Sequence, residues 1–136
     1  MSNIILDLTA PQDDFIFEEN PFPALMGGLG SGKTQGGYLR LLRLILSDKS
    51  NPDGAYYMPT YDLLRMRAIP GVMAVLDSMN IRYQMNKSTY TLDLKGRGSI
   101  IFRSYDNPNR IIAYEVAHSI VDELDTLIRV KAAEVW

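Results

Sequence analysis

One stretch of eight residues decides the expected fold, Gly27-Gly28-Leu29-Gly30-Ser31-Gly32-Lys33-Thr34. It has the pattern G-x-x-x-x-G-K-[ST], in which glycines let successive backbone N–H groups turn toward an anion. A helix that starts at the end of such a loop adds free N–H groups and the positive end of its dipole. The stretch therefore predicts a phosphate-binding loop whose eight residues contact a nucleotide.

The last two residues of the loop have separate roles. Lys33 is expected to place its charge on the β- and γ-phosphates, and Thr34 to offer its hydroxyl to Mg²⁺. The alternative is a glycine-rich turn that binds nothing. The flanks favour the site, because an apolar run at 22–26 precedes it and a helical pattern at 38–46 follows. In that helix, Arg40 and Arg43 are expected to mark the solvent side.

The bulk composition is that of a single globular domain. The chain has 136 residues, of which 46% are hydrophobic and 22% charged, and a net charge of −2 that does not by itself indicate nucleic-acid binding. Without cysteine there are no disulfides or thiolate metal sites, and His118 alone cannot build a His-based metal centre. No apolar stretch approaches the roughly 18 residues of a membrane span, so a cytoplasmic location is expected.

Periodicity predicts the order of the elements. Strands are expected at 22–26, 55–58, 81–85, 89–94, 99–103 and 117–121, and helices at 32–47, 61–66, 72–80 and from 125. Thr60 is expected to cap the second of these helices and Pro70-Gly71 to break it. Residues 95–98 are typical of the turn of an antiparallel hairpin.

This order predicts an α/β fold. We expect a P-loop NTPase of the RecA/ASCE type, with a mostly parallel sheet, helices on both faces and an inserted β-hairpin. The nucleotide would lie at the carboxyl ends of the strands. Residues 1–20, which carry acids but no Lys or Arg, are expected to form an N-terminal arm, and 21–136 the ATPase domain.

The apolar run that ends in Asp122-Glu123 is the expected partner of the loop. It matches a Walker B strand, in which Asp122 would hold Mg²⁺ opposite Thr34. Glu123 would then orient and polarise the attacking water as a general base. The alternative is an ordinary strand end with solvated acids.

Other polar residues allow two interpretations. Gln12 and Phe15 could recognise adenine, by amide and by ring, or be an exposed amide and a phenylalanine packed on the core. Arg103 and Arg110 could act as an arginine finger from a neighbouring subunit, contact DNA, or be ordinary surface or salt-bridging arginines.

Three further residues are expected to be structural or solvated. His118 is expected to be packed at a strand. Lys95 and Arg97 are expected to lie in a solvated turn, with contact to a phosphate backbone as the alternative.

Four segments together resemble the N-terminal ATPase region of the large terminase subunit of tailed bacteriophages. Pro11-Gln12 followed by Phe15 is similar to the upstream adenine motif of that family, and 27–34 to its Walker A loop. Residues 102–111 look like its F-R-S-x-D-x-P-x-R-[IL] segment, and 121–125 like its Walker B with the catalytic glutamate.

The resemblance implies an ATPase motor that uses ATP and Mg²⁺ to package viral DNA into the capsid. It implies Lys33, Glu123 and a trans-acting Arg110 as catalytic residues, Gln12 at adenine, and Thr34 and Asp122 on the metal. Double-stranded viral DNA, the portal protein, the small terminase subunit and further copies in a ring would be the partners. The implied location is the host cytoplasm and, transiently, the procapsid portal.

Such terminases also carry a coupling motif, the rest of the ATPase sheet and a nuclease domain. These parts are expected to be absent from a chain that stops at Trp136, which would leave the ATPase domain incomplete at its C-terminal side. A helicase-like DNA translocase and a non-catalytic nucleotide-binding fragment remain the alternatives.

Overall fold

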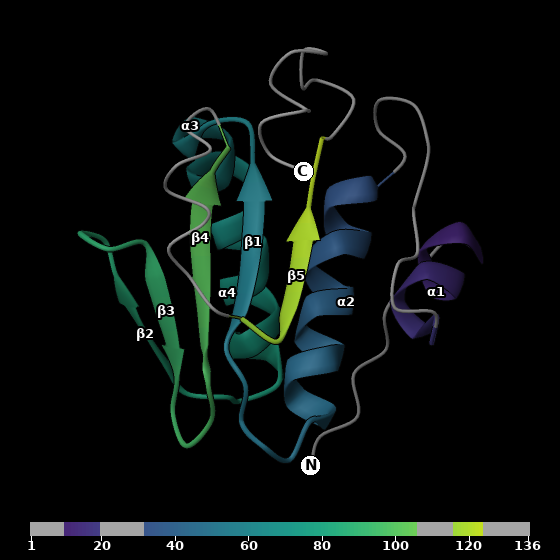
Figure 1. Ribbon diagram of the computed structural model, residues 1–136, viewed down its shortest axis with the longest axis horizontal. Helices are drawn as coiled ribbons and strands as arrows, with labels where there is room; N and C mark the ends of the chain where they lie inside the picture. Colours follow the sequence, from purple (N-terminus) through teal and green to yellow (C-terminus); the bar gives the residue numbers. More distant parts are fainter. Residues whose placement is uncertain (1–9, 20–31, 106–115, 124–136) are drawn as a thin grey trace.

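A computed structural model describes residues 10–19, 32–105 and 116–123 (Figure 1). The expected strand at 22–26, most of the loop at 27–31, Arg110 and the helix expected from 125 lie outside these residues. The described helices are α1 (Ala10–Phe17), α2 (Lys33–Ser47), α3 (Tyr61–Leu63), the π-helical segment η1 (Leu64–Ala68) and α4 (Ile69–Ser78). The described strands are β1 (Gly54–Met58), β2 (Tyr83–Asn86), β3 (Thr91–Leu94), β4 (Ser99–Ser104) and β5 (His118–Val121).

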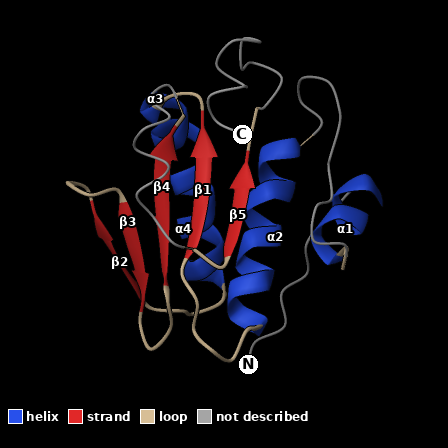
Figure 2. Cartoon of the chain, viewed as in Figure 1, coloured by secondary structure: helices blue, strands red, loops and turns tan. Residues whose placement is uncertain are grey.

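The five described strands form one sheet in the order β2-β3-β4-β1-β5 (Figure 2). β1 runs parallel to both β4 and β5, whereas β3 is antiparallel to β2 and to β4. The mixed α/β class, the parallel core and the antiparallel hairpin are therefore confirmed. Because β1 lies between β4 and β5 and is parallel to both, the carboxyl ends of these three strands lie side by side.

The main core lies between this sheet and the helices α2, η1 and α4. Leu41 and Ile45 of α2 pack with Tyr56 of β1, Phe102 of β4 and Ile120 of β5, and all five are buried. Each such side chain contributes about 1.5–3 kcal/mol relative to an exposed position. These helices all pack on one face of the sheet, and within the described ranges no helix covers the other face.

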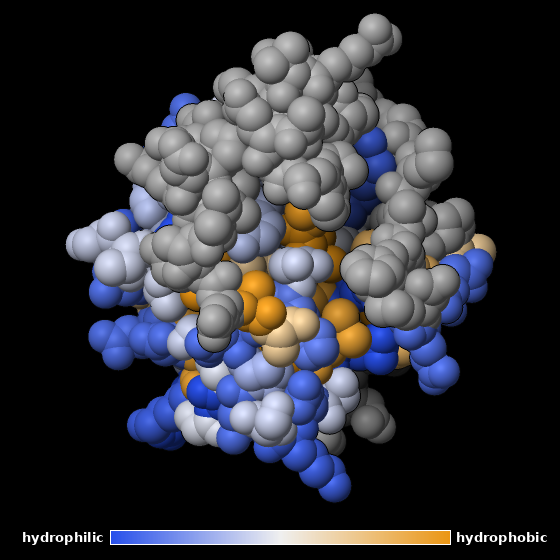
Figure 3. Space-filling model, viewed as in Figure 1, coloured by the Kyte–Doolittle hydropathy of each residue, from blue (hydrophilic) through white to orange (hydrophobic). Residues whose placement is uncertain are grey.

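A smaller apolar cluster lies on that second face of the sheet. Ala55, Tyr57 and Tyr105 are buried there, with Ile101 and Val121 packed against them. Figure 3 views this side of the molecule, where apolar side chains gather near the middle.

Pro70 does not break a helix, contrary to the sequence prediction. α3, η1 and α4 run on without a gap from Tyr61 to Ser78, and Pro70 occupies the first turn of α4. Just before it, the N–H of Ile69 donates to the carbonyl of Leu64, five residues back. This wider π turn ends where proline has no N–H to donate, so the helix tolerates the missing donor. The expected cap is confirmed, because the Thr60 hydroxyl accepts from the N–H of Leu63 at 3.2 Å.

Arg40 and Arg43 do not mark a solvent side, contrary to the sequence prediction. Arg40 is buried, and its guanidinium donates to the carbonyls of Phe15 at 2.8 Å and Glu18 at 2.7 Å. Arg43 donates to the carbonyl of Ile16. These cations meet carbonyls in and just after the last turn of α1, where the helix dipole favours positive charge. They hold α1 against α2.

Candidate active site

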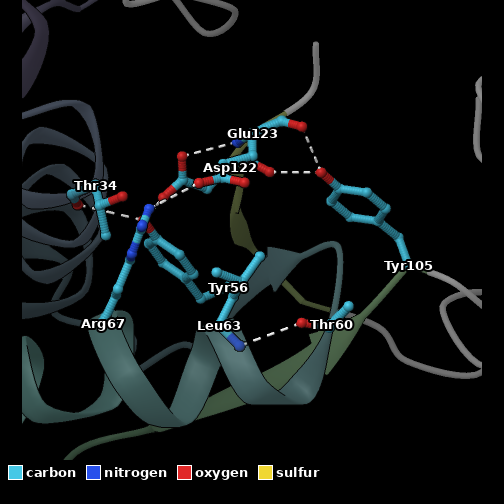
Figure 4. Close-up of polar contacts among 8 residues, drawn as sticks. All are labelled: Thr34, Tyr56, Thr60, Leu63, Arg67, Tyr105, Asp122 and Glu123. Atoms are coloured by element: carbon cyan, nitrogen blue, oxygen red, sulfur yellow. Dashed lines mark hydrogen bonds and ion pairs between the residues drawn. The ribbon is translucent and has the colours of Figure 1, made fainter. Parts of the chain in front are cut away.

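The candidate site lies where β1 and β5 end and α2 begins (Figure 4). Tyr57 of β1 pairs with Val121 of β5, and the next N–H, that of Asp122, donates to the Tyr57 carbonyl at 2.8 Å. This hydrogen bond extends the ladder by one residue and holds Asp122 at the edge of the sheet. The side chain of Asp122 is buried.

Tyr56 connects Asp122 to the start of α2. Its hydroxyl donates to Asp122 Oδ2 at 2.7 Å and lies 3.3 Å from the carbonyl oxygen of Thr34. Burial, and secondarily the Asp122 charge, raise the pKa of Tyr56 well above its ordinary value. The hydroxyl therefore keeps its proton at neutral pH and remains a donor.

The backbone after β5 is held in an unusual conformation. Glu123 has a φ of 54°, in the left-handed region, which costs a residue with a side chain about 1–2 kcal/mol. Its N–H donates to Asp122 Oδ1 at 2.8 Å. The Tyr105 hydroxyl lies 2.7 Å from the carbonyl oxygens of both Asp122 and Glu123. These contacts help to offset the strain of the backbone.

The Glu123 carboxylate pairs with Arg67, a residue that the sequence analysis did not identify. Arg67 Nη1 lies 2.9 Å from Glu123 Oε1, and their side chains are 50% and 21% exposed. Arg67 projects from η1, the π-helical segment. Nothing in the local sequence indicates this pair, because the two residues are far apart in the chain and the π turn has no periodic signature.

Gln12 supports the end of the phosphate loop. Its Nε2 donates to the carbonyl of Gly32 at 2.9 Å and to Gln35 Oε1 at 3.1 Å, and the side chain is buried. Gly32 has a φ of +79°, and a Cβ there would lie 2.2 Å from Gln12 Nε2. A side chain at this position would strain the backbone and displace the Gln12 amide, so glycine is favoured. Both hydrogens of the Gln12 amide are directed at protein acceptors. Adenine recognition by Gln12 stays a prediction.

The structure brings some of the other expected site residues together and does not describe others. Thr34, Asp122 and Glu123 lie in one hydrogen-bonded network through Tyr56. Lys33 starts α2 beside them. Gly27–Ser31 and Arg110 are outside the described residues. Phe15 packs partly buried against the core, which favours the packing interpretation over adenine stacking.

Arg103 does not project as a finger. It is buried, and its Nη1 donates to the carbonyls of Thr89 at 2.6 Å and Phe102 at 2.7 Å. These bonds hold the chain between β2 and β3 against β4, which favours a structural role for Arg103 over a finger or a DNA contact.

The remaining polar residues behave as structural groups. His118 Nε2 lies 3.3 Å from Asp48 Oδ2, as expected of a packed histidine. Arg97, in the turn between β3 and β4, donates to the Leu46 carbonyl at 3.1 Å, and Lys95 is exposed.

Two kinds of feature are absent from the described residues. No group of three or more His, Cys, Asp or Glu side chains could hold a metal ion there. In the same ranges, no helix has the length and apolar character needed to cross a membrane.

Comparisons with known proteins agree with this fold. The structure aligns with the large terminase of a thermophilic bacteriophage at a TM-score of 0.73, over 96% of this chain and with 14% identity. The chain has a large-terminase fold. A structure of the same phage terminase in complex with ADP aligns at a TM-score of 0.72, over 94% of this chain and with 16% identity.

The similarity is one of fold over part of a longer protein. This chain spans 36% and 35% of the length of the two phage terminase chains. No protein-family model matches the sequence, and no curated protein matches it.

Proposed function

We propose that this chain is the ATP-binding part of a terminase-like DNA-packaging motor and hydrolyses ATP at the site between α2 and β5. The observation that carries the proposal is the contact from Thr34 through Tyr56 to Asp122. Through this contact Thr34, the last residue of the phosphate-loop motif, lies close to Asp122, the acid that follows the apolar strand β5. The terminase fold, and the ADP held by one of the similar phage structures, support the same interpretation.

The residues present fit a magnesium ion. Mg²⁺ takes hard oxygen ligands, and it is commonly held by one or two protein groups together with phosphates and water. Among the described residues, each Asp122 carboxylate oxygen accepts one hydrogen bond, which leaves it a further lone pair for an ion. Asp122 and Thr34 would hold the ion, which neutralises charge that develops on the phosphates.

The protein groups would act in sequence. The loop, the N-terminus of α2 and Lys33 bind the phosphates. Glu123 leaves its pair with Arg67 and accepts a proton from the attacking water, whose oxygen bonds to the terminal phosphorus. The bond from that phosphorus to the oxygen that bridges it to the β-phosphate breaks, and this oxygen leaves as part of ADP. ADP and phosphate are the products. Coupling of this reaction to DNA, portal and neighbouring subunits belongs to the same proposal, as does a trans-acting Arg110.

Nucleotide binding by the full chain tests the proposal. We expect calorimetry to show ADP binding that Mg²⁺ strengthens and that Lys33→Ala abolishes. Lys49→Ala is the matched control, because Lys49 is an exposed lysine just after α2. If Lys33→Ala binds ADP like the parent chain, the site is assigned wrongly.

A non-catalytic role is the second candidate, and the Arg67–Glu123 ion pair favours it, because it occupies the carboxylate that hydrolysis needs. Tight ATP binding without turnover, in the chain and in its assembly on DNA, would support this alternative.

A further inference from the structure

Tyr56 lies beneath the proposed metal site, and nothing in the sequence pattern marks it. It belongs to an apolar run of β1, where the pattern is typical of a core residue. Its ring is fully buried, next to Phe102 at a centroid distance of 6.4 Å. Its hydroxyl, however, is directed at the Asp122 carboxylate.

The two ends of the Asp122 carboxylate are held by different donors. Tyr56 donates to Oδ2 at 2.7 Å, and the N–H of Glu123 donates to Oδ1 at 2.8 Å. A carboxylate fixed at both oxygens cannot rotate about its terminal bond, so its free lone pairs keep one direction. The Glu123 donor is backbone and is present with any side chain. Tyr56 is therefore the side chain that sets this orientation.

Helix α2 has a glycine, Gly37, where the Tyr56 hydroxyl approaches it. A Cβ on Gly37 would lie 2.8 Å from the Tyr56 hydroxyl and 3.2 Å from Ile120 Cγ2. Glycine in mid-helix is a poor helix former, yet here it lets the hydroxyl reach between α2 and β5. The hydroxyl also lies 3.3 Å from the Thr34 carbonyl, so it contacts both segments that would hold the ion.

We propose that Tyr56 is a positioning residue that orients Asp122 toward Mg²⁺ and ties it to the first turn of α2. The inference rests on the proposed nucleotide site. Partners of metal ligands of this kind typically change metal affinity by roughly 10–100-fold when removed. The competing explanation is that Tyr56 only fills the core and satisfies a buried carboxylate.

The test compares ADP binding with and without Mg²⁺ for the full chain and Tyr56→Phe. We expect Tyr56→Phe to bind ADP normally without Mg²⁺ and to lose roughly tenfold or more of the affinity that Mg²⁺ adds. Tyr83→Phe is the matched control, because Tyr83 lies on β2, at the far edge strand of the sheet from this site. It should keep the whole magnesium effect.

A second variant is needed in case Tyr56→Phe does not fold. Gly37→Ala keeps the tyrosine but forces its hydroxyl away, and it should reduce the magnesium effect in the same way. If either folded variant keeps the full magnesium effect, Tyr56 has no positioning role, while the nucleotide site stands. If the parent chain binds no ADP at all, the proposed function fails, and the role of Tyr56 fails with it.

Discussion

Arg67 and Glu123 form an ion pair of 2.9 Å between the π-helical segment η1 and the residue after β5. The backbone of Glu123 is in the left-handed region, and Arg67 lies in a π-helical turn. Irregular backbone of this kind is often kept at functional sites. The pair neutralises the carboxylate that we propose as the general base, so turnover requires the pair to open.

Removal of Arg67 should therefore speed ATP turnover. A half-exposed ion pair contributes about 0.5–1 kcal/mol, which corresponds to a roughly two- to fivefold faster reaction in Arg67→Ala. Arg65→Ala is the control, because Arg65 lies on the same segment but pairs with Asp62. Steady-state phosphate release checks this. A tenfold slower Arg67→Ala would show instead that Arg67 assists the reaction.

Substitution of Gln12 should weaken binding of all nucleotides alike. Its Nε2 donates to Gly32 and Gln35, so Gln12→Ala loosens the end of the phosphate loop. Two hydrogen bonds of about 0.5–1.5 kcal/mol each predict a loss of roughly fivefold or more. Calorimetry with ADP and GDP makes the comparison, with exposed Asp13→Ala as control. A loss confined to ADP would instead assign Gln12 to adenine.

Arg40→Ala should detach α1. Arg40 is buried, and its guanidinium donates to two carbonyls at the end of that helix. Hydrogen bonds of a charged group predict a loss of about 1.5–3 kcal/mol in the free energy of unfolding. Urea denaturation measures it, and Lys49→Ala should change nothing. Unaltered stability and unaltered amide protection of α1 in Arg40→Ala would refute this role.

The stabilising contribution of Asp48 should be lost in acid. Hydrogen bonds from Ser50, first from its side chain and then from its backbone, lower the pKa of Asp48, and His118 adds to the effect. A carboxyl whose pKa is lower in the folded state stabilises the fold above its unfolded pKa of about 3.9, and this contribution disappears as pH falls through the folded pKa. Asp48→Asn should therefore reduce stability at pH 7 but not at pH 2. Equal destabilisation at both values would exclude the linkage.

The sequence predicted the parts of the fold that depend on local pattern. α2, β1, the β3–β4 hairpin and β5 lie within a few residues of their expected positions, because each has a clear period and a turn or cap at its end. The Thr60 cap followed from its own residue type. The predicted site acids do lie beside the start of α2, since an apolar strand that ends in acids is a local signal.

The sequence predictions were wrong where contacts between residues far apart in the chain, or an irregular backbone, determine the structure. Arg40 is buried because the end of α1 supplies carbonyl acceptors, which helical periodicity alone does not reveal. Pro70 is tolerated because a π turn precedes it. The polar roles of Tyr56 and Arg67 depend on partners 66 and 56 residues along the chain. Such pairs need the tertiary structure.

Glu123→Gln gives the most direct test of ATP hydrolysis at this site. Glutamine keeps the shape of the side chain but cannot accept the proton from water, so we expect ATP turnover by the full chain to fall by roughly 10²-fold or more. Binding of ATP with Mg²⁺ should remain, since Lys33 and Asp122 are intact. A Glu123→Gln variant that hydrolyses ATP at the parent rate would contradict the assignment of this carboxylate and, with it, the proposed reaction.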